Sequence, residues 1–147
     1  MSKWTVNVPT LSTEATQLLV SKAAQRASEL GVAVNIAVFD AGLQLSAFLR
    51  MQDAHIGAMA IAMDKAWTSA GFGGRSTREI GQAVADMPEV TRIAILARPQ
   101  HTTLTGGAPI RISGVLVGAI GVSGGTPHQD EECASAGFAE IGADPVR

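Results

Sequence analysis

The sequence has few charged side chains for its length, and this shortage excludes some classes of protein. Only 16% of the 147 residues are charged, against about 25% in a typical soluble domain. The formal net charge of −2 leaves no strongly basic surface, which argues against nucleic-acid binding. Because 24 Ala and 16 Gly fill much of the remainder, we expect a homo-oligomer that hides an Ala/Gly-rich face.

The chain also lacks long apolar runs and paired cysteines. No stretch of 18 apolar residues occurs, so we expect no membrane span. The first residues, Met1 to Thr5, contain no signal-like apolar segment, so we expect a cytoplasmic protein. Cys133 is the only cysteine, which excludes an internal disulfide and a cysteine zinc cluster. Length and composition predict a single domain over residues 1–147.

Hydrophobic spacing predicts helices separated by two hairpins. The predicted helices cover residues 12–30, 56–72, 76–85 and 127–141. The predicted strands cover residues 32–39, 43–50, 108–112 and 115–122, and Gly118 and Gly121 in the last strand indicate close approach of another backbone. Residues 88–97 are compatible with either a short helix or a strand. This order of elements predicts an α+β domain with an antiparallel sheet.

The glycine-rich turn before the last helix is a candidate anion site. Thr126 is the expected N-cap, with Pro127 at the first helical position and Gln129 completing a capping box. Such a helix start presents free N–H groups to a carboxylate or phosphate. The alternative is a tight turn in which Gly124 and Gly125 only supply positive φ angles.

Acidic residues follow this turn and have two readings. Asp130, Glu131 and Glu132 complement the helix dipole, or one of them, Glu131 in particular, acts as a general base. His128 stands at metal-ligand spacing from Glu131 and Glu132. Because no HExxH companion occurs, we predict no metal site.

Two cations and two histidines are further candidates. Lys65, within an apolar helix, either pairs with Asp64 or Asp40, binds an anion, or reaches solvent. Arg50 ends a strand and suits a bidentate contact to a ligand carboxylate, unless it is only an edge charge. A net charge of +2 over residues 41–125 is compatible with an anionic small-molecule ligand. His55 and His101, in loops, suit a general base, a haem axial ligand or neither.

Five segments of the chain resemble the GlcG/HbpS-like proteins, a group that includes the carboxy-terminal domain of PduO-type adenosyltransferases. The similar segments are Asn35–Asp40, Ala47–Met51, Ile61–Thr68, Gly106–Ile110 and Gly118–Thr126, and the resemblance runs from Ser12 to about Gly137. It implies a profilin-like, three-layer α/β/α fold with a five-stranded antiparallel sheet, and dimers assembled into larger oligomers. Some members bind haem or a corrinoid, and others are encoded beside catabolic enzymes. The chain departs from the usual glycine-rich pattern between Asp86 and His101.

Two functions follow from these features, and both stay open at this point. The first is a small-molecule-binding protein of the GlcG/HbpS type whose ligand is haem or another tetrapyrrole, held by His55, His101 or Met51. With only six Phe and Trp residues, aromatic stacking on the ring would be sparse. A noncovalent haem is implied, because no Cys-x-x-Cys-His attachment signal occurs.

The second function is a small cofactor-free enzyme of the lyase or isomerase type acting on an anionic organic or aromatic acid. Lys65 and Arg50 would hold the carboxylate, and backbone N–H groups at Gly124 and Gly125 would stabilise developing negative charge. The proton would be moved by Asp40, Asp130, Glu131 or His101. The expected ligand-binding set also includes Gly107 and Thr126. A third reading is an accessory protein with no activity of its own.

Overall fold

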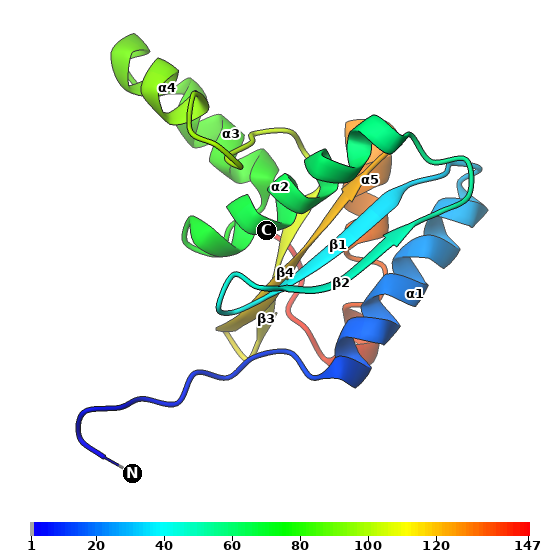
Figure 1. The fold of residues 1–147 in the computed structure, drawn as a ribbon, viewed down its shortest axis with the longest axis horizontal. Coiled ribbons are helices and arrows are strands. Elements are labelled where there is room, and N and C mark those ends of the chain that lie inside the picture. The colour runs from blue at the N-terminus through cyan, green and yellow to red at the C-terminus, as the bar shows by residue number, and fades with distance from the viewer. Residues whose placement is uncertain (1) are drawn as a thin grey trace.

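The computed structural model describes residues 2–147 and contains a four-stranded antiparallel sheet between helices (Figure 1). The strands run in the order β2-β1-β4-β3 and comprise β1 (Asn35–Asp40), β2 (Leu45–Arg50), β3 (Gly107–Ile112) and β4 (Val115–Ser123). One face is covered by α1 (Thr13–Glu29) and α5 (Pro127–Ala134), and the other by α2 (Met59–Gly71). Two further helices, α3 (Thr77–Ala85) and α4 (Glu89–Leu96), extend away from the sheet.

Strand β1 is buried on both faces and divides the core in two. Ile36 and Val38 belong to the larger cluster, which α1 and α5 complete, whereas Ala37 and Phe39 pack with residues of α2. Side chains alternate between the faces of a strand, so six consecutive residues serve both layers. Each fully buried aliphatic side chain contributes about 1.5–3 kcal/mol relative to exposure. The near-continuous apolar run therefore follows from the central position of β1.

Helix α2 lies very close to β4 because β4 carries glycine at the crossing. A Cβ atom on Gly121 would meet the carbonyl oxygen of Ala62 and would lie 2.6 Å from the amide nitrogen of Ala66. The prediction that glycine in this strand marks close backbone approach is confirmed. This contact brings the side chain of Lys65 onto the sheet.

The predicted helix and hairpin positions are largely confirmed, with some boundaries corrected. Residues 88–97 contain helix α4 rather than a strand, and the first strand begins at Asn35 rather than at residue 32. The second helix starts with a 3₁₀ turn (Ile56–Ala58) before α2. The last helix stops at Ala134, and only a 3₁₀ turn (Ala139–Ile141) follows, so the prediction of one helix over 127–141 is wrong.

The sheet has four strands among residues 2–147, not the five that the resemblance implied. The remaining segments that the structure describes are helices, turns and an N-terminal arm that pairs with no strand of its own chain. Within this part of the chain, no helix is both long and apolar enough to cross a membrane.

Candidate functional site

The glycine turn before α5 holds one of the protein's own carboxylates. The amide N–H of Gly125 donates to Oδ1 of Asp130 at 2.8 Å, and that of Thr126 donates to Oε1 of Gln129 at 2.9 Å. The predicted capping box is present, because Gln129 N–H also donates to Oγ1 of Thr126. The N–H groups of Gly125 and Thr126 are therefore bound within the chain, which favours the alternative of a closed turn over an open anion site.

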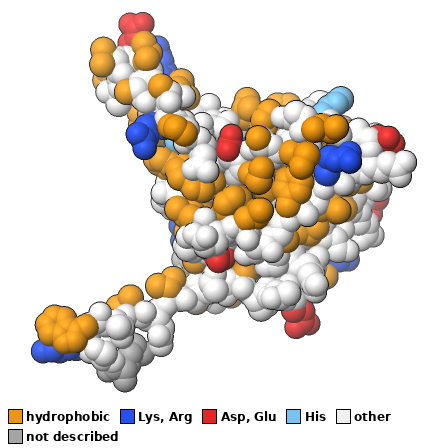
Figure 2. Space-filling view, viewed as in Figure 1, with side chains coloured by type: hydrophobic (Ala, Val, Ile, Leu, Met, Phe, Trp, Pro, Cys, Tyr) orange, Lys and Arg blue, Asp and Glu red, His pale blue; other side chains and the backbone are white. Residues whose placement is uncertain are grey.

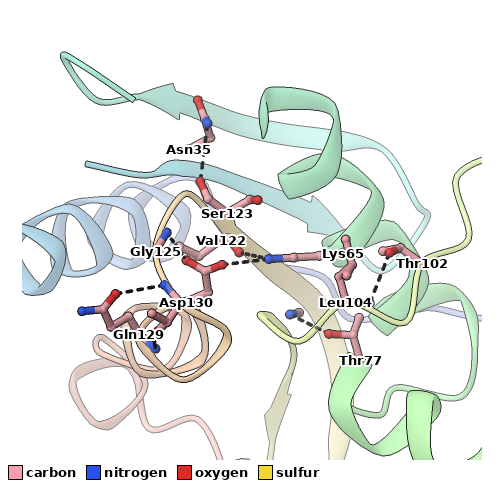
Figure 3. Close-up of polar contacts among 12 residues, drawn as sticks. Asn35, Lys65, Thr77, Thr102, Leu104, Val122, Ser123, Gly125, Gln129 and Asp130 are labelled. Carbon is pink, nitrogen blue, oxygen red and sulfur yellow. Dashed lines mark hydrogen bonds and ion pairs between the residues drawn. The ribbon is translucent and has the colours of Figure 1, made fainter. Parts of the chain in front are cut away.

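Lys65 forms a buried ion pair with the same carboxylate (Figure 3). Its side chain is 3% exposed, and Nζ lies 2.9 Å from Oδ2 of Asp130 and 2.7 Å from the carbonyl oxygen of Val122. The expected partners, Asp40 and Asp64, are wrong. The correct partner comes from α5, 65 positions along the chain.

Burial dominates the electrostatics of this pair. It lowers the pKa of Lys65 and raises the pKa of Asp130, and the attraction between the two groups opposes both shifts. Hydrogen bonds from the glycine turn also favour the ionised carboxylate of Asp130. Because removing water from two charges is costly, the arrangement depends on all of these contacts being present. Lys65 therefore joins α2, β4 and α5, and it is not free to hold a substrate.

His101 lies in a buried position that the sequence did not indicate. Its ring is 8% exposed and meets the edge of Phe72, with ring centroids 4.8 Å apart. The loop is held by Thr68, whose hydroxyl donates to the carbonyl oxygen of Gln100 and accepts from the N–H of Thr102. Nδ1 of His101 is buried without a hydrogen-bond partner. The imidazole is therefore best accommodated in its neutral form with the proton on Nε2.

Replacing His101 with Gln should flatten the dependence of stability on pH between about pH 7 and 5. Burial lowers the pKa of His101 below its ordinary value of 6.5, so the unfolded chain takes up this proton first as the pH falls. The free energy of unfolding then decreases below that pH, by at most about 1.4 kcal/mol per pH unit. Urea unfolding at several pH values tests this, with His128→Gln as the exposed control. Equal pH dependence in the His101→Gln variant and the unmodified protein would contradict it.

Two of the three predicted haem ligands, Met51 and His55, follow β2, and Arg50 is the last residue of that strand. Arg50 and His55 are exposed, whereas Met51 is half-buried against the larger core cluster. The carbonyl oxygen of His55 accepts a hydrogen bond from Nδ2 of Asn35 at 3.0 Å. Sequence reasoning missed Asn35, although a polar residue that begins an apolar strand is a usable signal. Its Oδ1 atom is buried and unpartnered.

Of the remaining predicted site residues, Gly107 packs against the main chain of Lys65, whereas Asp40 lies away from the buried pair. Asp40 accepts from the N–H groups of Gly42 and Gln44 and closes the first hairpin. It pairs in register with Gly118, at the opposite end of β1 from Ser123. The N–H of Gly107 donates to Oγ1 of Thr77, which anchors β3 to α3.

Glu131 and His128 border a surface cavity instead of the Lys65 pair. Glu131 forms an ion pair with Arg78, with Nε 3.1 Å from Oε1. The cavity, of about 520 Å³, lies between α5 and the C-terminal segment, and its apolar wall includes Phe138 and Val146. No group of three or more His, Cys, Asp or Glu residues that could hold a metal ion occurs within residues 2–147. What the structure brings together is thus the buried pair and its glycine turn, without Arg50, His55, Asp40 or Glu131.

Comparisons with known proteins agree with the fold. The model of the family described as "Haem degrading protein HbpS-like" matches residues 11–139. Protein GlcG of Escherichia coli K12 is 35% identical over 113 residues, which are 77% of this chain and 81% of GlcG. The crystal structure of a PduOC:heme complex has a TM-score of 0.84 at 28% identity and covers 94% of this chain and 99% of that one. The crystal structure of HbpS has a TM-score of 0.85 at 28% identity and covers 97% of both chains. Sequence and fold together establish that the chain belongs to the HbpS-like family.

Proposed function

We propose that this protein binds a small molecule of the tetrapyrrole class, with haem as the first candidate. The observation that carries this proposal is the similarity of nearly the whole chain to PduOC, which has been crystallised as a haem complex. Bound haem would supply an iron atom for ligand coordination and electron transfer. The residues of this chain must then supply an axial ligand, an apolar surface and a partner for the propionates.

His55 fits the role of axial ligand better than His101. An axial His binds iron through one ring nitrogen and normally donates the other N–H to an acceptor. Nδ1 of His101 has no acceptor, so ligation through Nε2 would leave a buried N–H unpaired, at a cost of about 1–3 kcal/mol. His55 is exposed, and the side chain of Asn35 fixes its backbone carbonyl. Met51 packs against the core and is a poorer ligand.

Exposed apolar side chains lie along β2 and α2 and at Ile56, the residue after His55. Figure 2 shows hydrophobic side chains gathered over β2 and α2. Ile56 and Leu45 are 73% and 49% exposed, and Phe48 and Trp67 are half-buried there. Such a surface is suited to a flat, apolar ring. Arg50 forms no ion pair among residues 2–147, so its guanidinium is free to bind a propionate.

Titrating haem into the protein tests the proposal. We expect a sharp Soret band, and we expect His55→Ala to weaken binding by about tenfold or more through loss of the axial bond. His128→Ala is the matched control, because it removes another exposed imidazole without affecting this surface. Absence of a Soret shift would contradict haem binding, and a shift that persists in His55→Ala would contradict the assigned ligand.

No observation favours the alternative of an enzyme acting on an organic acid. That hypothesis used Lys65 as the substrate-binding cation and the glycine turn as the anion-stabilising group. Lys65 is buried and paired with Asp130, and the N–H of Gly125 in the turn donates to the same carboxylate.

A further inference from the structure

The N-terminal arm, residues 2–10, carries an exposed apolar row, and Nζ of Lys3 lies 4.7 Å from the centroid of the Trp4 ring. Trp4, Val6 and Val8 alternate with polar residues and are 83%, 82% and 66% exposed. Figure 1 shows the arm leaving the domain, and Figure 2 shows its hydrophobic side chains standing clear of the body. Period-two alternation is the pattern of a strand with one buried face. The arm thus has the side-chain pattern of a strand but no sheet to join.

Hydrogen bonds hold the base of the arm in place, and they determine where the arm leaves the domain. Leu11 N–H donates to the carbonyl oxygen of Val117, and the hydroxyl of Thr10 accepts from the N–H of Ala41. These bonds hold the arm beside the first hairpin and the start of β4. Residues 2–9 are exposed beyond this point. Covering their apolar row therefore requires a surface outside this copy of the chain.

The two edges of the sheet differ in whether they can accept another strand. The edge of β3 is occupied at both ends, because Gly107 N–H is bound by Thr77 and the carbonyl oxygen of Arg111 accepts from Asp144 N–H. Pro109 in the middle of β3 has no N–H to offer. An added strand needs a row of free donors and acceptors, so the β3 edge is unsuitable.

The outer edge of β2 is open. Within residues 2–147, the strand hydrogen bonds of Leu45–Arg50 go to β1, and no backbone group bonds to the opposite side. The edge contains no proline and no lysine, the residues that commonly protect an exposed edge. Leu45 and Leu49, 49% and 37% exposed, pair in register with Phe39 and Ile36 and therefore offer apolar surface on opposite faces of the strand. An open, largely uncharged edge of this kind is a template for pairing.

We propose that residues 4–8 of one copy pair as a strand with the outer edge of β2 in a second copy. Five residues in extended form span about 17 Å, close to the length of the six-residue β2. The row of Trp4, Val6 and Val8 then lies beside the apolar side chains on one face of β2. Both copies carry an arm and an edge, so reciprocal exchange gives a closed two-fold dimer. This inference goes beyond ligand binding and does not depend on it.

Two aspartate variants of the full chain test the proposal with equal change in charge. Val6→Asp places a carboxylate in the apolar row, whereas Asn7→Asp places one on the opposite side of the same strand. We expect Val6→Asp to raise the dimer dissociation constant by about a hundredfold or more, and Asn7→Asp by less than about threefold. Sedimentation equilibrium measures both constants. Because Val6 and Asn7 are both exposed, circular dichroism should show the same fold in both variants.

Amide hydrogen exchange locates the contact. In the unmodified dimer, the outward-facing amides of β2 should exchange at least about tenfold more slowly than in Val6→Asp at the same concentration. A dimer that survives Val6→Asp with β2 still protected would indicate direct pairing of two β2 edges and overturn the proposal. Loss of the dimer without any change at β2 would place the arm elsewhere on the partner and overturn it equally. A monomer at all concentrations would also exclude it.

Discussion

Asp130→Ala should lower the free energy of unfolding by about 3–5 kcal/mol, a larger effect than we expect from other single changes of a charged residue. The substitution leaves the ammonium group of Lys65 at 3% exposure with only the carbonyl oxygen of Val122 as an acceptor. It also removes the acceptor of the Gly125 N–H at the start of α5. An unpaired buried charge costs far more than the intact pair contributes. Urea unfolding followed by circular dichroism measures the change.

Glu131→Ala is the matched control for this experiment. Glu131 is the next residue of α5, and its ion pair with Arg78 has side chains 24% and 41% exposed. A pair with that exposure contributes about 0–1 kcal/mol. The double variant Lys65→Met/Asp130→Leu should recover part of the loss, because apolar replacement of both partners leaves no buried charge. Equal losses from Asp130→Ala and Glu131→Ala would show that the buried pair does not hold α2 and α5 to the sheet.

Gly121→Ala should destabilise the fold by about 3 kcal/mol or more and reduce the yield of folded protein. The added methyl group meets the main chain of α2 at the carbonyl oxygen of Ala62 and 2.6 Å from the nitrogen of Ala66. Backbone atoms cannot move aside as a flexible side chain can, so the helix must shift away from the sheet. That shift would also withdraw Lys65 from Val122 and Asp130. Thermal unfolding is the direct measurement.

Gly57→Ala provides the comparison for this substitution. A Cβ atom at Gly57 has no neighbour within 4 Å, and its φ angle is not in the left-handed region. The same chemical change there should alter stability by less than about 1 kcal/mol. A small effect at Gly121 would mean that α2 and β4 tolerate wider separation than the packing implies.

Local sequence signals predicted the elements of this fold well. The predicted cap at Thr126 receives the expected backbone N–H group, and Ser12 and Ser76 cap α1 and α3 in the same way. These motifs are short-range, so one segment contains all the information they need. The last helix is shorter than predicted because α5 gives way at Ser135 to turns, although Ala and Glu residues continue. Helix propensity alone does not predict that α5 ends at this point.

The candidate site was harder to predict, because its contacts join distant segments. The apolar setting of Lys65 correctly indicated burial, but nothing local identifies a partner in α5. The sequence predicts for Asp130 either a charge that complements the helix dipole or a group that moves a proton. Its bond to Lys65 is found only when β4 brings α2 and α5 together. His101 was correctly placed in a loop, yet its burial depends on Phe72 from another element. The residue types predicted which chemical groups are present here, whereas the topology of the fold determines which of these groups a ligand can reach.

The carboxylate of Asp130 is bound at the glycine turn that precedes it and competes there with any external anion. A group held by the chain has an effective concentration of about millimolar or higher, set by the short segment between the turn and the carboxylate. A free organic acid would have to displace the carboxylate of Asp130, and this would leave the ammonium group of Lys65 without its ion-pair partner. Exchange of one anion for another thus carries the penalty of separating a buried pair. An external ligand is therefore disfavoured at the start of α5. A specific ligand must be bound by other surfaces of the molecule.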